Sequence, residues 1–334
     1  MKPKAVFLAS KRTVDLVFGE AAVAEVKARC DLIAPWIDLD DRQAIRSALS
    51  QAEIVLSSWG MPELTSDVLS SAAGLRIVIY GAGSVKSFVT EEVFKRCITV
   101  TTAAATNGRV VAEFVVALVT FCLKDAWRFI RSPSSAASYF AREQDWDGNV
   151  GFWGATVGIV SASEVGKSVL ELLHSFPCRT LVYDPYMSEA EVRSMGAVPV
   201  GLDELMRTSD VVTLHSPDIP ELHHFVDRRR LSLLKDGAWF INTARGRLVD
   251  QDALIDELQT GRIKACLDVT DPEPPVGESP LYSLPNVILT PHMAGAIGMD
   301  CRRLGAACME ELDRYLRGEL PMHPVRKEDL AIRA

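Results

Sequence analysis

The chain reads Ala238-Trp-Phe-Ile-Asn-Thr-Ala-Arg245-Gly246, the pattern of a buried strand that runs into a turn and ends on a cation. Two later segments have the same form: Lys264-Ala-Cys-Leu-Asp268-Val-Thr-Asp-Pro-Glu273-Pro274 and Asn286-Val-Ile-Leu-Thr-Pro-His292-Met-Ala-Gly295. In an open parallel α/β sheet, ligands bind at the carboxyl ends of the strands. The guanidinium, the carboxylate and the imidazole can therefore converge on one crevice. Such a set of groups can bind a 2-oxo acid and protonate it while a bound cofactor supplies the hydride that reduces it.

Strand and helix patterns alternate along nearly the whole chain, which is typical of parallel sheets covered by helices on both faces. Four short buried strands are expected in the first part, at 5–9, 53–57, 75–80 and 97–101. Six follow, at 155–160, 180–183, 210–215, 238–241, 264–267 and 286–290. Between the two sets, a long apolar helix is expected from about Arg109, with Asn107 available as its N-cap. Six strands suit a dinucleotide-binding domain.

Composition limits the classes of partner. The chain has 334 residues, enough for two globular domains, and its net charge of −8 makes a nucleic-acid partner unexpected. Seven scattered cysteines without C-x-x-C spacing indicate buried thiols in a reducing compartment and no metal site. The N-terminal apolar run is too short for an export signal, and the apolar stretch 110–123 carries Glu113 and is shorter than a membrane span. We therefore expect a cytoplasmic protein without a membrane segment.

The candidate cofactor turn is Ser161-Ala-Ser163-Glu164-Val165-Gly166, which follows a strand and opens a helix. In the G-x-G-x-x-G fingerprint the first two glycines make the turn and admit the pyrophosphate. Here only the third glycine is present, so either the turn shifts or the hydroxyl of Ser163 contacts the phosphate directly. The next strand ends at Asp184, 23 residues after Ser161, near the interval of about 20 expected for the ribose ligand. This carboxylate favours NAD over NADP.

The chain from about residue 81 onward resembles the D-isomer specific 2-hydroxyacid dehydrogenase family, which includes NAD-dependent phosphoglycerate, hydroxypyruvate, glyoxylate and D-lactate enzymes. Residues before Gly81 match mainly by pattern. The segments that carry the resemblance are Gly81-Ala-Gly83, Val111-Ala-Glu113, Tyr183-Asp-Pro185, Leu214-His-Ser-Pro217, 241–250, Leu267-Asp-Val269 with Glu273-Pro274, Leu284-Pro-Asn-Val and Thr290-Pro-His-Met-Ala-Gly295.

The resemblance implies a role for each member of the polar set. Arg245 would bind the substrate carboxylate and 2-oxo oxygen, since a guanidinium is planar and always charged. His292 would act as general acid, or as base in the reverse direction, and Glu273 would orient and stabilise the protonated imidazole. The family further suggests the other ligands. Backbone N–H groups at Gly83 and Ser84 would hold the substrate carboxylate, and Pro217, Thr243, Ala244 and Asp268 would line NAD.

Each of these residues also has a simpler explanation. Arg245 could only cap a strand, His292 could be structural, and Glu273 could be a solvated loop carboxylate between prolines. Lys86 either pairs with a second anionic group of the substrate or points into solvent. Trp59 either walls the pocket or packs in the core.

Together these features predict an α/β protein in which a Rossmann-type NAD-binding domain, 108–302, is inserted into a smaller flavodoxin-like substrate-binding domain, 1–107 and 303–334. The active site would lie in the cleft, and no further regulatory domain is expected. The aromatic segment 126–153 would reach across a homodimer interface. The alternative from another class is a catalytically silent NAD(H)-sensing or scaffolding protein, because two glycines are missing. The intact Arg-Glu-His set argues against it.

Overall fold

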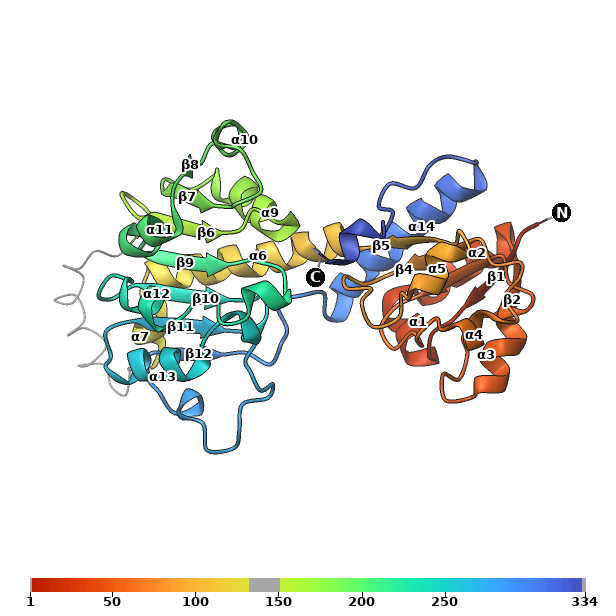
Figure 1. Ribbon diagram of the computed structural model, residues 1–334, viewed down its shortest axis with the longest axis horizontal. Coiled ribbons are helices and arrows are strands. Elements are labelled where there is room, and N and C mark those ends of the chain that lie inside the picture. The colour runs from red at the N-terminus through yellow and green to blue at the C-terminus, as the bar shows by residue number, and fades with distance from the viewer. Residues whose placement is uncertain (1, 132–150, 332–334) are drawn as a thin grey trace. The chain divides into compact units, whose positions relative to one another are not determined.

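A computed structural model describes residues 2–131 and 151–331 and divides the chain into two compact units. Unit 1 comprises Met1–Val110 and Ala296–Ala334, and unit 2 comprises Val111–Gly295. The division therefore falls at Val110 and Ala296, where the sequence indicated 107 and 303. Each unit contains one sheet in which every strand pair is parallel, so the predicted α/β fold class is confirmed (Figure 1).

Unit 1 is built on a five-stranded sheet of flavodoxin-like order, β2-β1-β3-β4-β5. Alternate strand residues point to opposite faces: Phe7 and Ile79 pack in one hydrophobic cluster with α1, α2 and α14, and Val6 and Val78 in the other with α3, α4 and α5. The strands are β1 (Lys4–Phe7), β2 (Asp31–Ala34), β3 (Ile54–Ser57), β4 (Ile77–Tyr80) and β5 (Thr99–Thr102). The helices are α1 (Lys11–Val17), α2 (Gly19–Arg29), α3 (Arg42–Leu49), α4 (Ser66–Leu69), α5 (Glu91–Lys95) and α14 (Cys301–Leu316), with 3-10 turns η5 (Gly298–Asp300) and η6 (Glu328–Ala331).

Unit 2 holds a seven-stranded sheet of doubly wound order, β12-β11-β10-β9-β6-β7-β8. The order reverses at β6, which pairs with both β7 and β9. The strands are β6 (Thr156–Val160), β7 (Arg179–Tyr183), β8 (Val198–Pro199), β9 (Val211–Leu214), β10 (Trp239–Asn242), β11 (Lys264–Leu267) and β12 (Val287–Leu289). The helices are α7 (Ala126–Arg131), α9 (Glu164–Leu173), α10 (Glu189–Ser194), α11 (Leu202–Thr208), α12 (Arg228–Ser232) and α13 (Gln251–Gln259), with 3-10 turns η2 (Pro220–Leu222), η3 (Gly246–Leu248) and η4 (Pro280–Tyr282).

Two strands were not expected from the sequence. β2 is at most half-buried and β8 is only two residues long, and both lie at sheet edges. An edge strand that is short or partly exposed lacks the continuous apolar run by which the buried strands were recognised.

The long helix α6 (Ala104–Leu123) begins five residues before the predicted start. Asn107 therefore lies inside the helix and is not its N-cap. Its side-chain Oδ1 instead accepts a hydrogen bond from the amide of Ala296 at 3.0 Å. Among the described helices, α6 is long and apolar enough to cross a bilayer, but just over half of its apolar window is buried within the protein.

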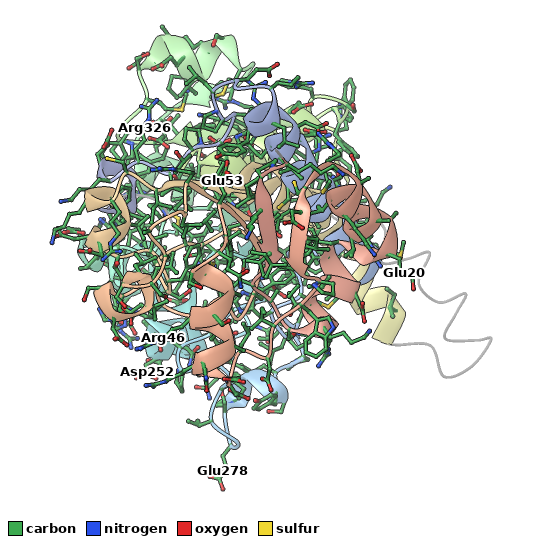
Figure 2. The ribbon with its side chains drawn as sticks, turned by 90° about the vertical axis from the view of Figure 1, so that its right-hand side faces the viewer. Glu20, Arg46, Glu53, Asp252, Glu278 and Arg326 are labelled. Atoms are coloured by element: carbon green, nitrogen blue, oxygen red, sulfur yellow. The ribbon has the colours of Figure 1, made fainter. Side chains whose placement is uncertain are left out.

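The C-terminal segment lies along β5 in unit 1. Val325 donates its amide to the carbonyl of Val100 at 2.8 Å, and Pro324 forms an antiparallel bridge with Thr101. The buried carboxylate of Glu311 in α14 accepts the amides of Met322 and His323 at 3.1 and 2.7 Å. A second link joins α14 to the sheet, since the Tyr315 hydroxyl donates to Glu53, a residue labelled in Figure 2, at 2.8 Å.

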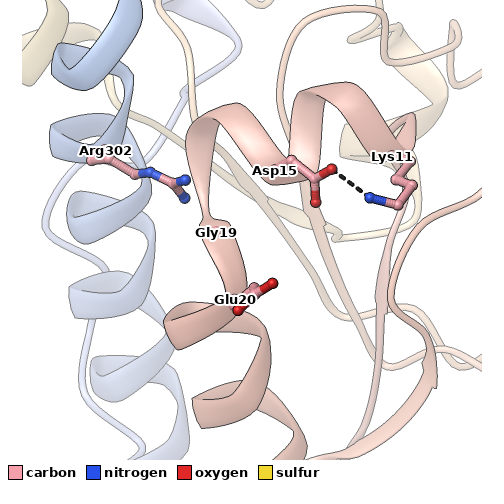
Figure 3. Close-up of a pocket in the computed structure, with 5 residues that line it drawn as sticks. All are labelled: Lys11, Asp15, Gly19, Glu20 and Arg302. Atoms are coloured by element: carbon pink, nitrogen blue, oxygen red, sulfur yellow. Dashed lines mark hydrogen bonds and ion pairs between the residues drawn. The ribbon is translucent and has the colours of Figure 1, made fainter.

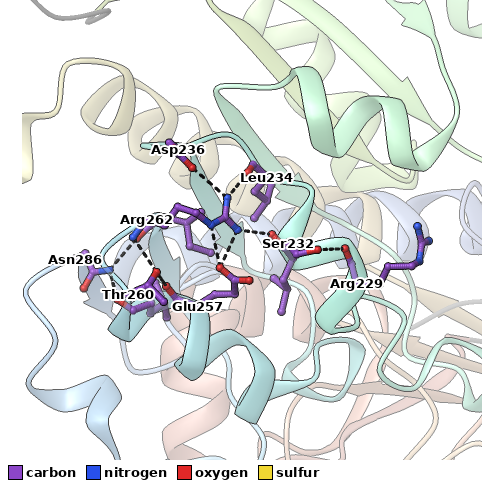
Figure 4. Close-up of polar contacts among 11 residues, drawn as sticks. Arg229, Ser232, Leu234, Asp236, Glu257, Thr260, Arg262 and Asn286 are labelled. Atoms are coloured by element: carbon purple, nitrogen blue, oxygen red, sulfur yellow. Dashed lines mark hydrogen bonds and ion pairs between the residues drawn. The ribbon is translucent and has the colours of Figure 1, made fainter.

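In unit 2, the guanidinium of Arg262 joins two chain segments, the one that precedes β10 and the one that precedes β11 (Figure 4). It donates to Glu257 Oε2 at 2.8 Å and to the backbone carbonyls of Leu231 and Leu234. The side chains of Arg262 and Glu257 are only 25% and 16% exposed. These contacts satisfy the carbonyl of Leu234, which follows α12, and give a second donor to the carbonyl of Leu231, which also accepts the amide of Leu234.

We expect Arg262→Ala to lower the free energy of unfolding by about 2–3 kcal/mol, because it leaves the buried carbonyl of Leu234 and the carboxylate of Glu257 without a donor. Arg228→Ala is the matched control. It removes a guanidinium paired with Asp256 at 2.6 Å on the surface, where both side chains are more than half exposed, and should cost less than about 1 kcal/mol. Urea denaturation measures both variants, and equal losses would contradict the structural role of Arg262.

Candidate active site

The three residues of the predicted polar set follow neighbouring strands of unit 2. β10 pairs with β11 and β11 with β12, with Asn242 opposite Leu267 and Leu267 opposite Leu289. Parallel pairing puts all three carboxyl ends at the same edge of the sheet. Arg245, Glu273 and His292 stand in the turns that begin there.

His292 and Glu273 are in direct contact. The ring Nδ1 of His292 lies 2.5 Å from Glu273 Oε1, and the two side chains are 49% and 41% exposed. Glu273 belongs to the loop that follows β11, and Figure 2 shows Glu278 at the outer tip of this loop. Because Nδ1 faces the carboxylate, the other ring nitrogen, Nε2, is left for a ligand.

Asp268 holds the turn that carries His292. This buried carboxylate follows β11 and accepts three hydrogen bonds, from Thr290 Oγ1 at 2.6 Å, Met293 N at 2.8 Å and Ala294 N at 2.9 Å. The amide of His292 also donates to the backbone carbonyl of Asp268 at 3.0 Å. His292 itself has a left-handed backbone, with φ of 52°. Such a conformation costs roughly 1–2 kcal/mol for an L-residue, and the four bonds offset it.

Arg245 is positioned by its neighbours on β10. Asn242 accepts from the amide of Ala244 and donates to the carbonyl of Arg245, both at 3.0 Å. A Cβ on Gly246 would overlap the backbone of Thr270 and Asp271, so only glycine lets this turn pack against the loop leading to Glu273. One guanidinium N–H of Arg245 donates to the carbonyl of Ala244, which leaves four of its five for a ligand.

The candidate cofactor turn keeps a tight conformation despite its serines. Ser161 has φ of 75°, a backbone shape that a glycine adopts without strain. Ser163 caps α9, with Glu164 and Val165 opening the helix, and its hydroxyl accepts the amide of Gly166 at 3.5 Å. Asp184 lies at the end of β7, and its Oδ2 accepts the amide of Ala162 at 2.8 Å. The structure thus brings Ser161 and Asp184 together at the switch point of the sheet.

The remaining predicted cofactor residues lie at the same edge of unit 2. Thr243 follows β10, and its hydroxyl is buried without a hydrogen-bond partner among the described residues. Pro217 follows β9 and is half-buried, as is Ala244. An orphaned buried hydroxyl beside a tight strand-turn-helix is consistent with a site for the predicted dinucleotide. The carboxylate of Asp268 is already engaged by the His292 turn.

His215 is a buried residue of this edge to which the sequence assigned no function. It directly follows β9, and its amide donates to the carbonyl of Val160 at 2.9 Å, next to the cofactor turn. Its ring Nε2 lies 3.1 Å from Thr213 Oγ1. Burial lowers the pKa of His215 to about 3, so the ring is neutral near pH 7.

In unit 1, the predicted carboxylate-binding residues Gly83 and Ser84 follow β4. The Ser58 hydroxyl donates to the carbonyl of Gly81 at 2.7 Å, and the Thr102 hydroxyl donates to the carbonyls of Ala82 and Gly83. No hydrogen bond within the described parts of the chain uses the amides of Gly83 and Ser84. Those two N–H groups are therefore available to an anion.

Trp59 and Lys86, the two residues of unit 1 for which the sequence left two roles possible, both lie on the surface. Trp59, which follows Ser58, is 40% exposed and does not pack as a core residue. Lys86 is exposed. Their functional alternatives remain predictions.

A separate depression of about 380 Å³ lies in unit 1 between α1, α2 and α14 (Figure 3). Its lining is charge-balanced: Lys11 is paired with Asp15 at 2.6 Å, and the guanidinium of Arg302 lies over Gly19, with Glu20 nearby. It contains no imidazole or other group suited to proton transfer near neutral pH. The candidate site considered further is therefore the edge of unit 2.

Residues 123–294 match the family model described as D-isomer specific 2-hydroxyacid dehydrogenase, NAD binding domain. The match covers the unit 2 sheet and each member of the polar set. Among known proteins, a glyoxylate reductase of Korarchaeum cryptofilum is 32% identical over 276 residues, covering 81% of this chain and 82% of that enzyme.

A D-3-phosphoglycerate dehydrogenase of Mycobacterium bovis is 29% identical over 312 residues, covering 92% of this chain and 57% of that enzyme. The chain thus spans little more than half the length of the phosphoglycerate dehydrogenases it matches. Among solved structures, the apo form of Rhodotorula graminis D-mandelate dehydrogenase superposes with a TM-score of 0.82 at 21% identity, covering 98% of both chains. That likeness concerns the fold.

His215 predicts a loss of stability in acid. Its folded pKa of about 3 lies below the unfolded value of about 6.5, so the unfolded chain takes up the proton first as the pH falls through 6.5. Between pH 7 and pH 5 this linkage should cost about 2 kcal/mol. Urea unfolding at pH 7 and at pH 5 measures the difference in the free energy of unfolding between the two conditions. We expect this difference to be smaller by that amount in His215→Asn. In His174→Asn, which removes an exposed ring, the difference in the free energy of unfolding should equal that of the wild type. An unchanged difference in His215→Asn would contradict the burial of a neutral ring.

Proposed function

Because the chain belongs to the D-isomer specific 2-hydroxyacid dehydrogenase family, we propose that it interconverts a D-2-hydroxy acid and its 2-oxo acid with NAD as the hydride carrier. The single observation that carries this proposal is the contact between His292 Nδ1 and Glu273 Oε1 at 2.5 Å, at the sheet edge where Arg245 also stands. When bound, the nicotinamide supplies or accepts the hydride.

His292 is the proton donor in the reductive direction. With Nδ1–H directed at Glu273, the protonated ring carries its second proton on Nε2, which gives it to the 2-oxo oxygen as hydride adds to the carbon. In the oxidative direction neutral Nε2 takes the proton from the hydroxyl. The Glu273 carboxylate stabilises the charged ring and sets its orientation.

Arg245 binds the anionic end of the substrate. Its free N–H donors match the spacing of carboxylate oxygens and can also polarise the 2-oxo oxygen, which is the atom that gains negative charge during hydride addition. Gly83 and Ser84 are the further carboxylate ligands of this proposal, because their amides are free. Thr102 orients those amides through the carbonyls of Ala82 and Gly83, which belong to the same two peptide groups.

Ser161, Ser163, Glu164, Val165, Gly166 and Asp184 are the proposed ligands of the adenosine and pyrophosphate parts of NAD. Pro217, Thr243, Ala244 and Asp268 are those nearer the nicotinamide. The Thr243 hydroxyl supports this assignment, since a buried hydroxyl without a partner costs free energy until a ligand satisfies it.

We also propose a cytoplasmic homodimer. The scattered spacing of the seven cysteines supports a reducing compartment, and five of them are buried thiols as predicted, whereas Cys97 is exposed and Cys178 is half-buried. The segment 126–153 predicted to form the interface lies largely outside the described residues. At its margins, Trp153 is 90% exposed and Phe121, on α6, is 38% exposed, which is consistent with an apolar surface that a second copy covers.

The substrate is tested by following NADH absorbance with glyoxylate, hydroxypyruvate, pyruvate, 2-oxoglutarate and phosphohydroxypyruvate. We expect at least one to be reduced. His292→Ala should lower kcat by roughly 100-fold to 10,000-fold, because the proton donor is lost, while NADH fluorescence titration shows unchanged binding. Arg245→Ala should raise KM and lower kcat together, since it removes both binding and polarisation of the substrate.

His174→Ala is the control for the loss of an imidazole, because that ring is exposed, its Nε2 pairs with the carbonyl of Met195, and it lies outside the candidate site. It should retain full turnover. Binding of NADH without reduction of any 2-oxo acid would favour the silent sensor. Full activity of His292→Ala would overturn the assignment of the proton donor.

A further inference from the structure

The carboxylate of Asp184 is largely occupied by the protein itself. Its Oδ2 accepts the amide of Ala162 at 2.8 Å and the hydroxyl of Ser161 at 3.3 Å, and its Oδ1 accepts the amide of Tyr186 at 2.8 Å. A carboxylate offers about four acceptor positions. The described structure thus leaves one position on Asp184, on Oδ1.

Of the three hydrogen bonds that Asp184 accepts, the one from the Ser161 hydroxyl is unusual. Ser161 occupies the place of the first glycine of the fingerprint, where the chain usually has no side chain. Its φ of 75° is the conformation that glycine adopts there, so the turn keeps its shape and the added Cβ and hydroxyl extend to Asp184. A hydroxyl that donates to this carboxylate makes the same kind of bond that a ribose hydroxyl makes in dinucleotide sites.

We propose that Ser161 is an affinity-setting residue for the cofactor, because its hydroxyl fills an acceptor position on Asp184 that a ribose hydroxyl would otherwise use. This inference rests on the proposed use of NAD. In the wild-type protein the adenosine ribose can place one hydroxyl on Asp184 rather than two. Removing the Ser161 hydroxyl frees the second position and tightens binding.

Ser163 provides the matched comparison on the same turn. Its hydroxyl caps α9 by accepting the amide of Gly166, and it is not among the described hydrogen-bond donors to Asp184. A change at Ser163 can alter the affinity for the pyrophosphate. It leaves the number of free acceptor positions on Asp184 as it is.

The experiment measures binding without turnover. NADH is titrated by its fluorescence into wild-type protein, Ser161→Ala, Ser161→Gly and Ser163→Ala, and AMP, 2′-deoxy-AMP and 3′-deoxy-AMP are then used as competitors. Ser161→Ala and Ser161→Gly should both bind NADH roughly threefold to tenfold more tightly, which is the net effect of one additional hydrogen bond of ordinary strength. Urea unfolding confirms that each variant is folded.

The competitors report how many ribose hydroxyls reach Asp184. In the wild type and in Ser163→Ala, only one of the two deoxy nucleotides should bind more weakly than AMP. In Ser161→Ala, both deoxy nucleotides should bind more weakly than AMP, each by roughly threefold to tenfold. Equal patterns in the wild type and Ser161→Ala would overturn the inference, as would tighter binding by Ser161→Gly alone, which would assign the effect to the backbone.

These outcomes separate the inference from the proposed function. If no variant binds NADH or AMP, the cofactor proposal and this inference both fail. If the pattern of deoxy nucleotides appears but no 2-oxo acid is reduced, the role of Ser161 stands and the dehydrogenase proposal fails.

Discussion

The hydrogen bonds accepted by Asp268 are the constraint on which the active site depends. One buried carboxylate at the end of β11 binds Thr290, Met293 and Ala294 and so holds the turn after β12 around a left-handed residue, His292. Without those bonds the backbone at His292 would relax to a more favourable conformation and its ring would leave Glu273. The chemistry of the site is therefore set by an acceptor that does not itself take part in proton transfer.

At other strand ends, too, a side chain fixes the backbone of a turn by hydrogen bonds. Asn242 clamps the turn that carries Arg245, Asp184 holds the cofactor turn through Ala162, and in unit 1 the hydroxyls of Ser58 and Thr102 fix the carbonyls of the loop at Gly83. In each case a side chain at or next to a strand end gives the turn after the same or a neighbouring strand part of the rigidity of the sheet. Functional groups on loops need such support, since displacements of about 1 Å already reduce catalysis.

The sequence predicted the fold class and ten of the twelve strands in the described residues, because buried strands form clear apolar runs. It missed β2 and β8, which are edge strands, and it placed the start of α6 too late because Asn107 has the residue type of a cap but bonds instead to Ala296. It identified His292 and Glu273 by residue type and position, and the structure places them in contact. The supporting roles of Asn242 and Thr290 could not be seen, since each depends on a contact that only the folded chain creates.

Amide hydrogen exchange at residues 292–294, compared between the wild type and Asp268→Asn, tests the central constraint most directly. The side chain of Asp268 accepts three hydrogen bonds. In asparagine, one of the two oxygens is replaced by an NH2 group that cannot accept, so at least one of the three bonds is lost. The account predicts protected amides at His292, Met293 and Ala294 in the wild type and rapid exchange at these positions in Asp268→Asn, with β9 unaffected. Unchanged protection in Asp268→Asn would show that the turn is held by something else and would contradict the account.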